Sequence, residues 1–80
     1  MGHARSRPKR LAEKLLQIRT TLGLSQSQIA KRIGVLNYTD ISKYERDINE
    51  PPATVLLAYA RAASIPVEQI VDDQLDIEIR

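Results

Sequence analysis

The residues from 37 to 46 combine polar, hydrogen-bonding side chains with helical spacing. On a helix, Ile41, Tyr44 and Ile48 fall on one apolar, inward face. The outward face consists of Thr39, Ser42, Lys43 and Arg46. A lysine can donate to guanine O6 and N7, and a threonine offers its hydroxyl to either base edge or its methyl to thymine. The pattern therefore predicts a surface that contacts nucleic acid, with a merely solvated or phosphate-bound Lys43 as the alternative.

Catalytic chemistry finds little support in the rest of the chain. The chain has no cysteine, and its only histidine, His3, lies in a polar terminus. The candidate nucleophiles Ser25, Ser27 and Ser42 lack a base, and there is no glycine-rich phosphate loop or metal-ligand cluster. We therefore expect no enzyme activity, no cofactor and no metal.

Helical segments must position the polar face. The 80 residues suffice for one domain. Apolar residues recur every three or four positions, and Ser25 and Gln28 have the spacing of a capping box at a helix start. The predicted helices run from Pro8 to Gly23, 25–33, from the Asn37 or Thr39 cap to about Arg46, 53–63 and 67–71. The fold predicted is an all-α five-helix bundle.

The charge of the chain is strongly divided. Residues 1–46 carry a net charge of +7 and residues 47–80 a net charge of −5. We expect a flexible basic arm over 1–7, a helical domain over 8–72 and an acidic tail over 73–80. A basic arm can follow phosphates or enter a minor groove, whereas its alternative role is only to solvate the terminus.

The tail alternates apolar and charged residues from Leu75 to Arg80. Strict alternation is typical of a strand, but a lone strand is unstable in water. The pattern predicts either a dimerisation strand paired with a second chain or a disordered tail.

A short helix, a small-residue turn and a second helix form the geometry that places a helix in the DNA major groove. Ala30 is small enough for two helices to cross closely, and Gly34 suits the turn. The residues that carry a family resemblance are Leu24-Ser25-Gln26, Ile29-Ala30, Ile33-Gly34-Val35, Ile41-Ser42, Glu45-Arg46, Pro51 and the helix with Leu56, Leu57, Ala60 and Ala63. The chain resembles the helix-turn-helix domains of phage repressors, Cro proteins and their bacterial relatives, the XRE type, from about Leu11 to Val71.

Three departures from that family's pattern stand out. The segment from Gly34 to Ile41 is one residue longer than the commonest spacing, which leaves the register of residues 37–39 open. Asp47 replaces a usual glycine, and Pro52 replaces a usual serine or threonine cap. Aspartate tolerates turns and proline tolerates a helix start, so neither of these two replacements should break the fold.

The resemblance implies roles for individual residues. Base contacts would come from Asn37, Tyr38, Thr39 and Lys43, although the Tyr38 ring could instead pack on the turn. Phosphate contacts would come from Gln26, Arg46 and Asn49, together with Arg5, Arg7, Lys9 and Arg10 of the arm. A second helix cap is the alternative for Gln26. The family also pairs a base on the first helix with Glu45, which here predicts a Lys14–Glu45 pair.

The function that these inferences favour is sequence-specific binding of double-stranded DNA by a transcriptional regulator. Repression by a homodimer is the simplest mode, in the cytoplasm at the nucleoid. The alternative is an antitoxin-like interaction module that binds a protein partner and for which DNA is secondary. No apolar run approaches the roughly 20 residues of a membrane span, so we expect no membrane partner.

Overall fold

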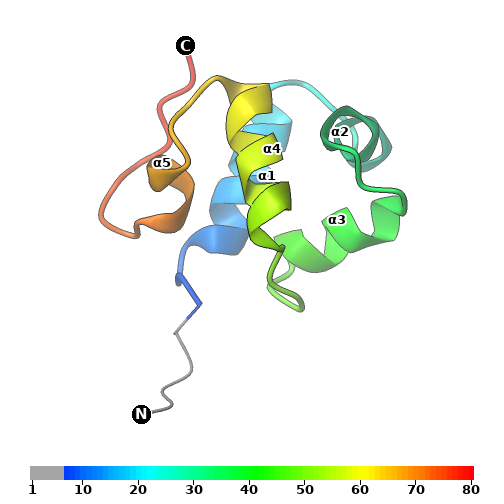
Figure 1. The fold of residues 1–80 in the computed structure, drawn as a ribbon, viewed down its shortest axis with the longest axis horizontal. Coiled ribbons are helices and arrows are strands. Elements are labelled where there is room, and N and C mark those ends of the chain that lie inside the picture. Colours follow the sequence, from blue (N-terminus) through cyan, green and yellow to red (C-terminus); the bar gives the residue numbers. More distant parts are fainter. Residues whose placement is uncertain (1–6) are drawn as a thin grey trace.

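Five helices form the folded body of residues 7–80, the part of the chain that the computed structural model describes. They are α1 (Leu11–Thr21), α2 (Gln26–Ile33), α3 (Tyr38–Glu45), α4 (Ala53–Ala63) and α5 (Glu68–Val71). α1 and α4 lie at the centre, with α2 and α3 on one side and α5 with the C-terminal segment on the other (Figure 1). No strand occurs within this part of the chain. The predicted all-α five-helix fold is confirmed.

The core lies where the apolar stripes of α1 and α4 meet. Leu15 and Ile18 of α1 and Tyr59 of α4 are completely buried. Burial of a leucine or isoleucine side chain contributes about 1.5–3 kcal/mol relative to exposure. The neighbouring Ala60 and Ala63 are also buried and small. α1 packs against α3 on one side of the bundle and against α5 on the other.

The helix ends follow the predicted signals. The Ser25 side chain accepts a hydrogen bond from Gln28 N (3.0 Å), and the Gln28 side chain accepts one from Ser25 N (2.8 Å), which completes the predicted capping box. Pro52 occupies the N-cap position of α4 without a side-chain hydrogen bond. Asp47 has a left-handed backbone with φ of 61°, which a short polar side chain tolerates.

The prediction that Ile48 faces inward is wrong. Its side chain is 52% exposed. α3 ends at Glu45, and the left-handed turn at Asp47 redirects the chain before Ile48. The helical repeat that would have carried Ile48 to the inner face therefore stops one turn too early.

The first helix begins at Leu11, three residues after the predicted start at Pro8. A carboxylate from the other end of the chain occupies the intervening turn. Asp73 accepts hydrogen bonds from the backbone amides of Lys9 (2.8 Å) and Arg10 (3.0 Å). These bonds lower the pKa of Asp73. The acidic tail thus supplies the capping group that the sequence around α1 lacks.

The C-terminal segment packs against the helices as irregular chain. Ile77 is buried and Ile79 is partly buried against the core. The Glu78 backbone amide donates to the Gln69 side chain at 2.9 Å. The alternating pattern of the tail therefore places isoleucines on the helical body within the single chain, without a strand.

Lys14 is a buried cation at the contact between α1 and α5. Its ammonium donates at 2.7 Å to each of the Gln69 and Asp72 carbonyl oxygens, and its side chain has no exposed area. Burial lowers its pKa. Because carbonyls at a helix C-terminus lack partners within the helix, Lys14 satisfies the end of α5 and attaches it to α1.

Candidate nucleic-acid interface

The turn between α2 and α3 is built from a left-handed glycine and two following residues. Gly34 has φ of 78°, and the Val35 amide donates to the Ala30 carbonyl oxygen at 2.8 Å. Ala30 is buried beneath the turn. Val35 is half-buried against the core, whereas Leu36 is fully exposed. This geometry sets the angle at which α3 leaves α2.

The structure settles the register of the first turn of α3. Asn37 is the N-cap, and its Oδ1 accepts from the Thr39 amide (3.1 Å) and the Thr39 hydroxyl (2.8 Å). Tyr38 is the first helical residue, and Ile41 is completely buried. The additional residue of the longer spacing therefore lies in the turn, where Leu36 points to solvent.

An ion pair anchors α3 to α1. Arg19 donates from Nε to Glu45 Oε2 at 2.7 Å and from Nη2 to Glu45 Oε1 at 3.1 Å. Gln26 of α2 donates to Glu45 Oε1 at 3.1 Å. The Glu45 side chain is only 5% exposed, so one carboxylate on α3 receives donors from both preceding helices. The hydrogen bond with Glu45 also raises the pKa of Arg19.

The predicted Lys14–Glu45 pair is wrong. Lys14 faces α5, as described above, and Arg19 holds Glu45 instead. The two basic residues are five positions apart on α1, which separates them by about 7.5 Å along the axis and turns them to different faces. The guanidinium forms the two-pronged pair with a carboxylate that a lysine cannot form.

The outer surface of α3 is polar and accessible. Tyr38, Thr39 and Lys43 are exposed, and none of the three has a hydrogen bond from its side chain to another helix within residues 7–80. Asn37 is exposed too, but its Oδ1 is engaged as the helix cap. Paired recognition of adenine needs both the oxygen and the nitrogen of an asparagine amide. The cap therefore leaves Asn37 only its NH₂ group as a donor.

The predicted phosphate-contact residues are distributed over three places. Arg46 and Asn49 are exposed at the end of α3 and in the loop that follows. Arg46 Nε donates to the Ser42 carbonyl oxygen at 3.3 Å, within its own helix. Gln26 lies at the start of α2 with its amide nitrogen donated to Glu45, so its side chain is part of the anchor of α3.

The basic residues predicted for the arm lie against different parts of the molecule. Arg5 lies outside the described residues. Arg7 donates to Asp47 Oδ1 at 2.9 Å, beside α3, and Lys9 is exposed. Arg10 turns the other way and donates to Asp76 Oδ1 at 2.8 Å. The structure thus brings Arg7 to the loop after α3 but directs Arg10 to the acidic tail.

Two other kinds of site, a metal centre and a membrane span, are absent from the described residues. No group of three potential metal ligands occurs among residues 7–80. Within the same residues, no helix is both long and apolar enough to pass through a membrane. The exposed polar surface of α3 and its flanking turns is the candidate site that the structure favours.

The sequence predicted no role for two residues of this region, Arg19 and Leu36. Arg19 could have been preferred to Lys14, because a guanidinium forms the better pair with a carboxylate. The exposure of Leu36 also had a signal in the sequence, because the longer spacing from Gly34 to Ile41 requires one residue of the turn to lie outside the core. Neither signal indicates by itself which way the side chain points.

Two curated proteins are similar to this chain in sequence. A curated relative from Rhodospirillum rubrum, an uncharacterized transcriptional regulator in the ATPase CF(0) region, is 36% identical over 79% of this chain and 57% of its own length. Antitoxin HigA1 from Mycobacterium tuberculosis is 33% identical over 80% of this chain and 42% of its own length. The chain thus spans about half the length of these relatives.

A solved structure of a SinR protein/SinI protein complex contains a chain with the same fold. The TM-score is 0.71 at 23% identity, over 80% of this chain and 62% of that chain. The family model described as helix-turn-helix matches residues 15–70, which include α2, the turn and α3. The chain therefore belongs to the XRE-type helix-turn-helix family of DNA-binding regulators.

Proposed function

We propose that this protein binds specific sequences in double-stranded DNA and regulates transcription by inserting α3 into the major groove. The observation that carries the proposal is the combination of an exposed polar face on α3 with an anchored inner face. Glu45 receives donors from α1 and α2, so the orientation of α3 does not depend on the ligand. Because α3 is already held in place, less conformational entropy is lost when it binds DNA.

Base recognition is assigned to the exposed residues Tyr38, Thr39 and Lys43. Lys43 suits a guanine, and Thr39 suits either edge or a thymine methyl. Asn37 contributes its NH₂ group. Arg46, Asn49 and Lys9 suit phosphates, which fix the register on the duplex. Gln26 serves first as an anchor of α3, and its helix start offers backbone amides to a phosphate.

The mode of regulation that we propose is repression by a homodimer at the bacterial nucleoid, in the cytoplasm. Proteins of this kind bind two half-sites about 34 Å apart on one side of the duplex. Occupancy of such a site is enough to block a promoter. The support for this mode is the chemistry of α3 and the family, together with a relative whose name is that of a transcriptional regulator.

The proposal is tested by selection from a pool of random DNA duplexes at moderate salt. Moderate salt is needed because low salt strengthens non-specific binding. We expect an inverted repeat to be enriched. Lys43→Ala should relax the preference at one base position, whereas the matched variant Arg46→Ala, at the residue that follows α3, should weaken binding to all duplexes alike. Identical effects of both variants on specific and random DNA would show that Lys43 does not read a base.

An antitoxin-like module is the second candidate function. Two observations favour it: the similarity to antitoxin HigA1 and an open apolar groove of about 440 Å³. The groove is lined by Pro8, Glu50, Pro51, Ala53, Leu56, Leu57, Val67 and Val71. Co-purification with the product of a neighbouring gene, together with the absence of an enriched DNA sequence, would favour this function over the first.

A further inference from the structure

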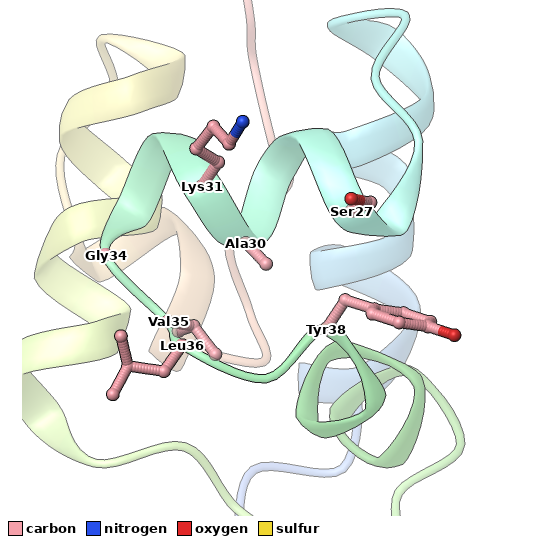
Figure 2. Close-up of a pocket in the computed structure, with 7 residues that line it drawn as sticks. All are labelled: Ser27, Ala30, Lys31, Gly34, Val35, Leu36 and Tyr38. Carbon is pink, nitrogen blue, oxygen red and sulfur yellow. The ribbon is translucent and has the colours of Figure 1, made fainter.

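A hollow of about 330 Å³ lies between α2 and the start of α3. It is lined by Ser27, Ala30, Lys31, Gly34, Val35, Leu36 and Tyr38. Figure 2 shows Ala30 pointing from α2 toward this space, with Val35 and Leu36 on the turn and Tyr38 at the beginning of α3. The hollow therefore borders the first turn of the helix to which we assign base recognition.

The most unusual residue of the hollow is Leu36. Its side chain is fully exposed, while Val35 beside it is half-buried against the core. Tyr38 is 54% exposed. Single exposed apolar residues are common on protein surfaces, but apolar residues gathered around a concavity mark binding sites. Leu36 contributes little to the fold, so its apolar surface is available to a ligand.

The composition of the lining restricts the ligand. No acidic side chain lines the hollow, and Lys31 is its only charged residue. A polyanion can therefore approach it without repulsion. The hollow is also continuous with the outer face of α3 through Tyr38. When the second helix of such a motif enters the major groove, its N-terminal residues lie against base edges.

Thymine presents the one apolar group on the major-groove edges of unmodified DNA, its C5 methyl. We propose that Leu36 contacts a thymine methyl and makes a T·A pair at that position part of the recognised sequence. This inference rests on the proposed function and adds a specificity residue to it. An apolar contact of this kind excludes water from the methyl and requires no hydrogen bond.

The test uses the sequence enriched from the random pool and replaces its thymines one at a time with uracil. Uracil differs from thymine only in lacking the C5 methyl, so base pairing is retained. We expect one position in each half-site at which uracil weakens binding about fourfold, the ratio expected for burial of one methyl group. Leu36→Ala should reduce this ratio to below about twofold, because the contact is then absent.

Leu57→Ala is the matched control, because Leu57 is another exposed leucine but lies on α4 in a different groove. It should retain the fourfold ratio. The proposal is overturned if no thymine position is sensitive to the methyl, or if the sensitivity is unchanged in Leu36→Ala. If no sequence is enriched from the pool at all, the proposed function fails and this inference fails with it.

Discussion

Replacement of Glu45 by alanine should destabilise the domain through the loss of one carboxylate that joins three helices. Glu45 accepts two bonds from Arg19, at 2.7 and 3.1 Å, and one from Gln26 at 3.1 Å, with 5% of its side chain exposed. Removal of one partner of a buried ion pair costs about 3–5 kcal/mol. Arg19 remains 18% exposed and keeps a bond to the Leu24 carbonyl oxygen. We therefore expect the lower end of that range.

The loss should be about 3 kcal/mol, against a total stability of about 4–12 kcal/mol for a domain of this length. The measurement is urea unfolding followed by circular dichroism, with the free energy of unfolding extrapolated to zero denaturant. A double-mutant cycle with Arg19→Ala isolates the pair. A hydrogen bond to a charged group contributes about 1.5–3 kcal/mol, and the partial exposure of Arg19 reduces the contribution of its two bonds. We therefore expect a coupling free energy of about 2 kcal/mol.

The exposed pair Arg7–Asp47 is the matched control for this cycle. Its side chains are 35% and 61% exposed, so a cycle built from Arg7→Ala and Asp47→Asn should give a coupling of about 0–1 kcal/mol. Added salt should remove most of this coupling and less of that between Arg19 and Glu45. A coupling below about 0.5 kcal/mol between Arg19 and Glu45 would refute the conclusion that this pair anchors α3.

Three further predictions concern the core and the tail. Lys14→Met keeps the side-chain volume but leaves the Gln69 and Asp72 carbonyls without their donor, so the free energy of unfolding should fall by about 2–3 kcal/mol in urea titrations. An unchanged value would mean that the two bonds contribute nothing. Tyr59→Phe should raise the free energy of unfolding by about 1 kcal/mol, since the buried hydroxyl has no partner among residues 7–80; a decrease would indicate that the hydroxyl is bonded. The pKa of Asp73 is lowered in the folded state, so the unfolded chain binds more protons at this residue. The stabilisation from Asp73 is therefore present above about pH 4 and is lost as the pH falls through the folded pKa. The stability difference between the native chain and Asp73→Ala should therefore shrink in acid, and a constant difference from pH 7 to pH 3 would contradict this.

Local sequence signals predicted most of the framework of this protein. The spacing of Leu11, Leu15 and Ile18 defines a helical face without reference to the rest of the chain. The Ser25–Gln28 capping box and the left-handed Gly34 are likewise decided within a few residues. These predictions succeeded because a helix is closed by hydrogen bonds between residues only four positions apart.

Site features that depend on distant residues were harder to predict. The predicted ion-pair partner of Glu45 was Lys14, although the fold places Arg19 against it. Helical periodicity placed Ile48 inside, but the turn at Asp47 ends the helix first. The direction of Arg10 depends on a tail that is more than sixty residues away in the chain. In each case the side-chain type was compatible with more than one partner.

The helices, their caps, the helix-turn-helix spacing and the polar character of the face with Thr39 and Lys43 could all be predicted from the amino-acid sequence. Those properties follow from local backbone bonding and from the types of the residues. Three other features depend on how the helices pack: which basic residue of α1 holds α3, the capping of α1 by the tail, and the exposure of Leu36 in the turn. These outcomes follow from which surfaces meet when the helices pack, and no spacing along one segment contains that information.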